Sequence, residues 1–236
     1  MSPFSGGLHE FDLTGVSVMI GIPVNRDFPA STTVSLVETC IALRDHNIPV
    51  DLTLEVGCSI PQHARSLVAD NFLRSDKTHL FWIDSDLAWK TEDFIKLLCL
   101  ATQTEVVGAT YPAKMEPTTF LMRFREDTQA LNEFGCMTVD GLGLGFTVIQ
   151  RKVMEQLAEK ARKVKFTSRP YLVPYIFRCD TIEEDGQETT RGEDMAFFAD
   201  IRALGYTIHV DPGVRLRHIG PKAYTGAMID AMKRIS

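Results

Sequence analysis

The sequence predicts a single α/β domain with a mostly parallel central sheet flanked by helices. Short apolar runs rich in β-branched residues alternate with longer amphipathic segments, which is the order of a βαβ protein. The 236 residues can bury one sizeable core, and 44% hydrophobic with 24% charged residues is typical of a folded globular protein. Because no repeat, low-complexity tract or linker divides the chain, we expect one domain over residues 1–236.

The alternation of strands and helices is clearest before residue 110. Strands are predicted where apolar residues run without interruption, and helices where they recur every three or four positions, as Val34, Val37 and Ile41 do. Ser59 and Gln62 have the spacing of a capping box ahead of the second helix. The predicted strands are 16–22, 49–56, 79–84 and 106–109, and the predicted helices are 31–45, about 64–72 and 91–101.

The second half of the chain is less regular. A poorly patterned stretch covers residues 114–133, and a glycine-rich turn then feeds a strand that ends near residue 150. A basic helical segment follows, and the polar residues 179–192 are predicted to form a mobile loop. The last predicted elements are a largely buried helix from Glu193 to Leu204, ended by Gly205, and a strand at 206–210.

Composition excludes several classes of protein. The amino-terminal residues lack the features of a signal peptide and no stretch reaches the roughly 20 apolar residues of a membrane span, so we expect a cytoplasmic protein. Five widely spaced cysteines without a CxxC pair favour neither a disulfide framework nor a thiolate zinc site. The net charge of −6 argues against an overall electrostatic grip on nucleic acid, although residues 151–169 are locally basic.

The sharpest motif is IDSDLAW, residues 83–89, in which two carboxylates directly follow a buried strand. Ligands of α/β sheets bind beyond the carboxyl ends of strands, so Asp84 and Asp86 stand where a site is expected. Two such oxygen donors suit Mg²⁺ or Mn²⁺, hard ions that leave coordination positions open for substrate phosphates. A strand-end turn or a helix cap is the purely structural alternative.

Two further motifs carry polar groups. RGEDMAFFADIRALGY, residues 191–206, places Glu193 and Asp194 at the start of a buried helix, where the macrodipole favours carboxylates in any protein. VDPGVRLRHIG, residues 210–220, places His218 after a strand and a turn. A lone histidine is usually an ordinary surface or core residue, so His218 indicates a site only in combination with the two carboxylate motifs.

Taken together in this order, the three motifs resemble those of the GT-A glycosyltransferases, in particular the small, soluble members related to glycosyltransferase family 2 that are common in bacteria and bacteriophages. The resemblance extends from about Val16 to Gly220 and implies a GT-A-like, Rossmann-like domain with a nucleotide-binding half (15–110) and an acceptor or catalytic half (111–236). It is densest in HARSLVADNFLRSDKTHLFWIDSD, VVGATYPAK, DGLGLGFTVIQRKV and GEDMAFFADIRALGY.

The resemblance also implies a role for each motif. Asp84 and Asp86 correspond to the DxD motif that holds a Mn²⁺ or Mg²⁺ ion on the donor diphosphate, and His218 is a candidate further metal ligand. Glu193 and Asp194 face the acceptor, with Asp194 as the general base. A sugar hydroxyl has a pKa far above 7 and needs such a carboxylate within hydrogen-bond reach as it attacks the anomeric carbon.

Other residues are expected to contact the donor. Gly141, Gly143 and Gly145 would allow close approach of the backbone to a sugar, and a tight turn into a strand explains them equally well. Arg65 and Lys114 are expected to neutralise the carboxylates or the diphosphate, with ordinary surface pairing as the alternative. The predicted donor-binding set is Pro23, Arg26, Glu55, Arg65, Asp84, Ser85, Asp86, Lys114 and Gly143.

The function implied by the resemblance is transfer of a sugar from a nucleotide-sugar donor, a UDP-sugar by default, to a hydroxyl acceptor with inversion. Retaining GT-A enzymes share the fold and the DxD motif, so the stereochemistry stays open. The acceptor is also open: a saccharide, a protein, a small molecule or modified bases in DNA, the last suggested by the basic segment 151–169. A phage-encoded enzyme would act in the host cytoplasm.

Two other classes remain as alternatives. A nucleotidyltransferase also places acidic residues and Mg²⁺ beside a nucleotide, but it normally has a glycine-rich phosphate loop after the first strand, where this chain has GIPVNRDFPAS. A non-catalytic binding module predicts that the acidic clusters need not converge on one site. The positions of the clusters in the folded chain distinguish this second alternative from an enzyme.

Overall fold

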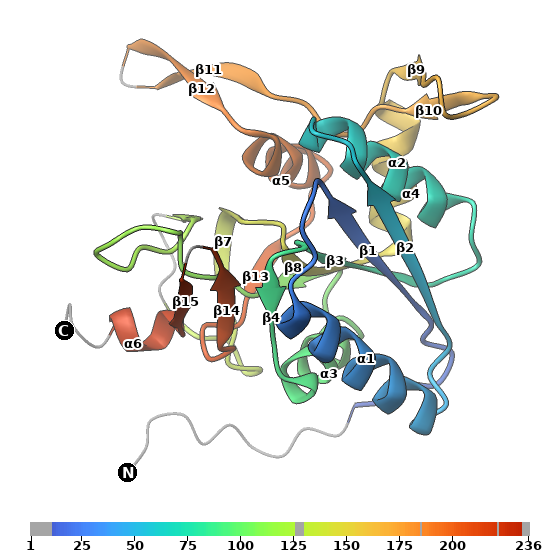
Figure 1. The fold of residues 1–236 in the computed structure, drawn as a ribbon. Coiled ribbons are helices and arrows are strands. Elements are labelled where there is room, and N and C mark those ends of the chain that lie inside the picture. Colours follow the sequence, from blue (N-terminus) through green and yellow to red (C-terminus); the bar gives the residue numbers. More distant parts are fainter. Residues whose placement is uncertain (1–10, 126–129, 185, 221, 233–236) are drawn as a thin grey trace.

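The fold is described from a computed structural model that covers residues 11–125, 130–184, 186–220 and 222–232. Its centre is an eight-stranded sheet in the order β2-β1-β3-β8-β5-β13-β7-β6 (Figure 1). The strands are β1 (Val18–Val24), β2 (Val50–Val56), β3 (His79–Ile83), β5 (Val106–Gly108), β6 (Met122–Phe124), β7 (Met137–Leu142), β8 (Phe146–Gln150) and β13 (Ile208–Val210).

The sheet is mixed and mostly parallel, as predicted. β2, β1 and β3 pair in parallel, and so do β5 and β13. β8 lies between β3 and β5 and is antiparallel to both, so those two strands still point the same way. β7 is antiparallel to β13 and to β6. The carboxyl ends of β1, β2, β3, β5 and β13 therefore meet at one edge of the sheet.

Helices cover both faces of the sheet. The side chains of β3 alternate between the faces: Phe81 stacks on Phe94 with ring centroids 3.9 Å apart, whereas Trp82 packs edge-on against Phe177 at 5.4 Å. The first core contains residues of α1 and α3, and the second contains residues of α2, α4 and α5. These helices are α1 (Ala30–Asp45), α2 (Pro61–Leu73), α3 (Thr91–Leu100), α4 (Arg151–Lys160) and α5 (Glu193–Ala203).

Smaller sheets surround the central one. β4 (Leu87–Ala88), β14 (Leu216–Ile219) and β15 (Ala223–Gly226) form a three-stranded sheet, followed by α6 (Met228–Met232). β9 (Lys163–Lys165) pairs with β10 (Leu172–Pro174). β11 (Asp180–Glu184) and β12 (Gln187–Arg191) form a hairpin that extends away from the body of the protein beyond α5 (Figure 1).

Several local predictions were wrong. The segment predicted as a mobile loop at 179–192 is largely the β11–β12 hairpin, with five register pairs from Asp180↔Arg191 to Glu184↔Gln187. The capping box does not form, because the N-cap of α2 is Ile60, without a side-chain cap, and Pro61 supplies the first turn. Apart from the short β4, the order of strands and helices before residue 110 was otherwise predicted correctly, with boundaries shifted by at most three residues.

The apolar stripe of the first predicted helix does not face the core. Val34, Val37 and Ile41 are exposed, and α1 instead buries Ser35 and Thr39 among its core-facing residues. These hydroxyls are paired: Ser35 donates to the Trp89 carbonyl at 2.8 Å, and the Trp89 indole donates to Thr39 at 2.9 Å. Polar residues can face inward here because Trp89, which follows β4, supplies their hydrogen-bond partners.

In the part of the chain that the structure describes, no helix combines the length and the apolar character needed to cross a membrane.

Candidate active site

The predicted acidic motifs converge at the carboxyl edge of the sheet. Asp84 directly follows β3, and its N–H donates to the Gly145 carbonyl, 2.9 Å away, in the turn between β7 and β8. α5 begins beside the same turn, because the Leu144 N–H donates to Asp194 Oδ2 at 3.2 Å. Hydrogen bonds thus bring Asp84 and Asp194 to the same turn. An enzyme needs this convergence, whereas the binding-module alternative did not require it.

Arg65 joins the two carboxylate motifs. Its Nη2 lies 3.2 Å from Asp84 Oδ1 and 3.2 Å from Asp194 Oδ1, and its Nε lies 3.8 Å from Glu193 Oε1. The guanidinium is buried, whereas each carboxylate side chain remains 22–23% exposed. One cation therefore faces three carboxylates, and the group keeps a net negative charge at an accessible position.

This environment shifts the pKa values of the cluster. Burial alone would lower the pKa of Arg65, but Asp194 and Asp84 raise it, so the guanidinium stays charged. Burial raises the pKa of Asp194 to about 6, with Asp84 and Glu193 adding to the increase and Arg65 opposing it. A carboxylate with a pKa near 6 is a stronger base than an ordinary aspartate and is still ionised at neutral pH.

Tyr111 completes the surroundings of Asp84. Its hydroxyl donates to Asp84 Oδ2 at 2.7 Å, while Arg65 occupies Oδ1. Burial and the neighbouring Asp84 carboxylate raise the pKa of Tyr111 well above its usual value, so the phenol remains a donor. Sequence reasoning missed this residue, although it lies only three positions after β5, whose carboxyl end is at the same edge of the sheet as Asp84.

Two glycines of the turn lie so close to Tyr111 and Asp84 that a side chain in their place would collide with them. A Cβ at Gly145 would lie 2.2 Å from Asp84 Oδ2 and 2.7 Å from the Tyr111 hydroxyl. A Cβ at Gly143 would lie 2.9 Å from the same hydroxyl. The requirement for glycine in this turn is therefore explained within the protein, and contact of Gly143 with a donor remains a prediction.

Asp86 forms a second group with Lys114 and His218. The Lys114 ammonium lies 2.5 Å from Asp86 Oδ2, and His218 Nε2 lies 3.5 Å from the same oxygen. β14 brings the histidine there by pairing with β4, which directly follows the DxD motif. Burial would raise the pKa of Asp86, but His218 and Lys114 outweigh it and hold the pKa below its usual value.

The orientation of His218 fits a metal ligand. Its Nδ1 lies 2.8 Å from the Pro112 carbonyl, which can only accept, so Nδ1 carries a proton, and Nε2, which faces Asp86 Oδ2, is the ring nitrogen that a cation between the two could bind. Asp86 and His218 thus offer one oxygen and one nitrogen donor on the same side. Among the described residues no group of three or more His, Cys, Asp or Glu side chains could hold a metal, so further ligands would come from substrate or water.

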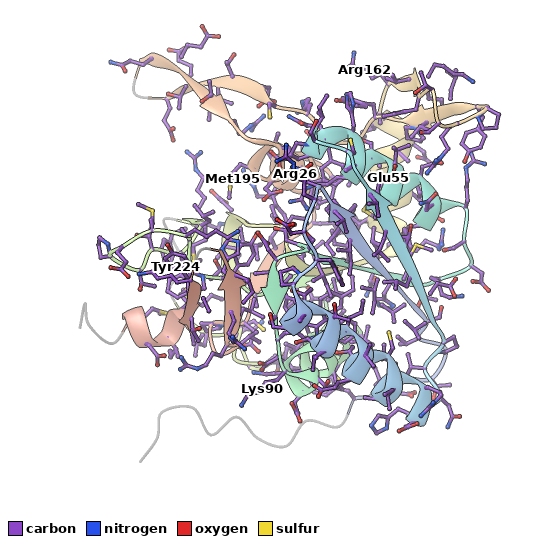
Figure 2. All side chains as sticks on the ribbon, viewed as in Figure 1. Arg26, Glu55, Lys90, Arg162, Met195 and Tyr224 are labelled. Carbon is purple, nitrogen blue, oxygen red and sulfur yellow. The ribbon has the colours of Figure 1, made fainter. Side chains whose placement is uncertain are left out.

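Three other residues predicted to contact the nucleotide lie at the ends of β1 and β2. Pro23 and Glu55 are register partners near the ends of β1 and β2, and Arg26 follows β1 at the same edge of the sheet (Figure 2). Glu55 pairs with Arg169, 3.5 Å away in the segment between β9 and β10. These positions stay predicted nucleotide contacts.

Comparison with known proteins was informative only at the level of structure. No family model matches the sequence, and no curated protein matches it. The chain is similar to the crystal structure of GalNAc-T7 with UDP, GalNAc and Mn²⁺, with a TM-score of 0.51 and 10% identity. The similarity covers 88% of this chain and 44% of that one, so this chain spans less than half of that protein.

This chain has a GT-A-like fold. A second similar structure is a 4-diphosphocytidyl-2C-methyl-D-erythritol synthase from Anaerococcus prevotii, with 10% identity over 65% of this chain and 80% of that one. Its TM-score of 0.37 is too low to support an argument. At these identities the comparisons establish the fold alone, and the chemistry must be argued from the site.

Proposed function

We propose that this protein is a glycosyltransferase that moves a sugar from a nucleotide-sugar donor to a hydroxyl acceptor, with Asp194 as the general base. The observation that carries the proposal is the contact of one buried guanidinium, Arg65, with both Asp84 and Asp194. Through this contact Asp84, at the end of β3, lies close to Asp194, whose pKa is raised. Asp84 would face the donor and Asp194 the acceptor.

The proposed chemistry is a displacement at the anomeric carbon. The acceptor oxygen forms a bond to that carbon while the bond from the carbon to the donor diphosphate oxygen breaks, and Asp194 takes the hydroxyl proton. Asp86 and His218 would hold the Mn²⁺ or Mg²⁺ ion, which would neutralise charge on the leaving diphosphate. Asp84, predicted as a third ligand, has Oδ1 bonded to Arg65 and Oδ2 bonded to Tyr111. Asp84, fixed by Arg65 and Tyr111, would orient the donor beside them.

The donor and lineage are proposed more specifically from resemblance. UDP is the default nucleotide, consistent with the UDP and Mn²⁺ that accompany GalNAc-T7 in its crystal structure. We place the chain near the small family 2 enzymes of bacteria and bacteriophages, with inversion of the anomeric carbon. Glu193 would assist Asp194 on the acceptor side.

DNA carrying modified bases is a less favoured acceptor. Three of the seven basic residues of 151–169 have partners within the protein: Arg151 donates to the Lys77 carbonyl at 2.7 Å, Lys152 lies 2.9 Å from Glu105, and Arg169 pairs with Glu55. Hydroxyls of a saccharide, protein or small molecule remain the preferred acceptors. A salt-sensitive gel shift with duplex DNA would reverse this preference.

A panel of thermal shifts tests the proposal. UDP, GDP, CDP, dTDP and ADP are each added with Mn²⁺ or with EDTA, and one nucleotide should raise the melting temperature only with the metal. Asp86→Ala should abolish that shift, whereas Asp194→Asn should keep the shift and lose transfer. Full transfer by Asp194→Asn would refute the assignment of the base, and no response to any nucleotide would refute the donor.

A further inference from the structure

The outer edge of β2 has the features of an interface. β2 is the last strand of the central sheet on its side, beyond β1 (Figure 1). Leu52, Leu54 and Val56 are 46%, 39% and 66% exposed, so α1 covers this face of the strand only in part. An apolar edge strand without proline or a bulge invites pairing with another strand, a hazard that proteins normally block.

The backbone of β2 leaves alternate residues free to pair outward. Val18 N–H donates to the Pro49 carbonyl and Gly57 N–H donates to the Val24 carbonyl. These contacts and the parallel register Val18↔Val50 show that the backbone groups of the odd-numbered residues of β2 bond to β1. The N–H and C=O groups of Val50, Leu52, Leu54 and Val56 therefore point away from the sheet. No described strand pairs with them.

The sequence of this strand is nearly palindromic. VDLTLEV reads the same in both directions about Thr53, apart from the exchange of Asp51 for Glu55. An antiparallel two-fold pairing centred on Thr53 would place Leu52 opposite Leu54 and Val50 opposite Val56. Those are the residues with outward backbone groups, so each would form a hydrogen-bonded pair, and Thr53 would face its own copy in a non-hydrogen-bonded pair.

The charged residues of the strand do not oppose this pairing. It would bring Asp51 of one copy opposite Glu55 of the other, but each already has a cation of its own chain. Lys77 lies 3.1 Å from Asp51 and Arg169 lies 3.5 Å from Glu55. The exposed stripe of Val34, Val37 and Ile41 on α1 adds apolar surface on the face that carries Leu52 and Leu54.

We propose that two copies of this chain associate through antiparallel pairing of their β2 strands about a two-fold axis at Thr53, forming one continuous sheet. A closed two-fold contact uses the β2 edge of both copies, so this contact does not propagate into a fibre. The interface lies outside the carboxylate cluster and is independent of the proposed transferase activity.

Sedimentation velocity of the full chain over micromolar concentrations tests the proposal. We expect a species of twice the chain mass. Leu54→Lys should raise the dimer Kd by more than about 100-fold, because the two-fold axis buries the new charge twice. The matched control is Leu172→Lys on β10, which is 53% exposed and should leave the dimer intact. A monomeric wild type, or a dimer unaffected by Leu54→Lys, would overturn the proposal.

Cross-linking tests the register. Thr53→Cys should form an intermolecular disulfide under mild oxidation, because the two residues 53 face each other across the axis. Val56→Cys is the control, since two copies of residue 56 would lie about 20 Å apart along the strands. The oxidised wild type gives the background from the native cysteines. Equal cross-linking of the two variants would refute this register.

Discussion

At the scale of single residues, the contact between Lys114 and Asp86 sets the charge of the predicted metal site. The ammonium lies against the carboxylate oxygen that also faces His218 Nε2. Both partners are about one-third exposed, so water weakens their attraction and the lysine can leave. A divalent ion binding at Asp86 would therefore displace Lys114 and free it to contact the donor diphosphate.

Lys114→Met should raise the affinity for Mn²⁺ in the absence of nucleotide by about 3- to 30-fold, because a competing charge is removed while the side chain keeps its length. Titration followed by Mn²⁺ electron paramagnetic resonance measures this affinity. With the metal present, the same variant should bind nucleoside diphosphate more weakly. Lys222→Met, which removes an exposed lysine paired with Glu116, serves as the control. An unchanged Mn²⁺ affinity would show that the ion pair does not compete.

Asp194 should couple stability to pH. Its pKa is about 6 in the folded chain against 3.8 as the ordinary value, so folding disfavours its ionised form. The penalty is absent below about pH 4, grows as pH rises, and is complete above about pH 6. The stability gain of Asp194→Asn over wild type should therefore grow from near zero at about pH 4 to as much as about 3 kcal/mol at pH 7.

Urea unfolding of both proteins across this pH range measures the gain. Glu188→Gln, on the exposed β11–β12 hairpin, should show no such growth. If Asp194 is the base, transfer by the wild type should fall as pH decreases through about 6. A gain that is constant with pH would contradict the raised pKa of Asp194.

At the scale of elements, the turn between β7 and β8 is built around the side chains it touches. Gly145→Ala would place a Cβ 2.2 Å from Asp84 Oδ2, which must then move away from Tyr111 or Arg65. We expect a loss of about 1–3 kcal/mol of stability and of the metal-dependent thermal shift with nucleotide. Gly192→Ala is the control, because no atom lies within 4 Å of the added Cβ. Wild-type nucleotide binding by Gly145→Ala would show that the position of Asp84 is unimportant.

The β11–β12 hairpin stands outside both cores. Its base is held by Arg191 and Arg178, which both contact Asp180, and Glu184 near its tip contacts Arg123 of β6. β12 then leads through Gly192 directly into the acidic start of α5. This position suggests a role in holding the acceptor, because the hairpin adjoins Asp194 and contributes no buried apolar residue.

At the scale of the whole molecule, we expect the nucleotide-binding half (15–110) to bind its ligand even when acceptor binding by the second half (111–236) is impaired. Replacing residues 181–190 with an Asn-Gly turn joins the register partners Asp180 and Arg191, and the strand residues that it removes are exposed or half-buried. We expect an unchanged circular dichroism spectrum and nucleotide-dependent thermal shift, with transfer lost mainly through a higher KM for acceptor. The point variant Glu184→Gln, which weakens the contact with Arg123, should show a smaller effect in the same direction. Loss of nucleotide binding would show that the halves are not separable.

The sequence by itself predicted the fold class and singled out the acidic motifs that the fold brings to one edge of the sheet. A short, wholly apolar run such as β3 is stable in the middle of a sheet that is covered on both faces. A carboxylate pair that ends such a run therefore lies at the edge where the strands end. The positions of Asp84, Asp86, Glu193 and Asp194 followed from this local logic, whereas His218 lies in β14, a strand that was not predicted. Periodicity failed for α1, because the exposed stripe and the buried hydroxyls depend on neighbouring segments.

Only the tertiary structure decided which residues meet. Arg65 and Tyr111 lie 19 and 27 positions from Asp84. Arg65 was expected to neutralise the carboxylates, but no local pattern indicates that Tyr111 would bind Asp84. The role of β2 as the outer strand likewise follows from the order of strands, since its apolar residues alone would suit a buried position. Contacts between distant segments depend on the packing of the whole chain, whereas helices, strands and their ends depend chiefly on nearby residues.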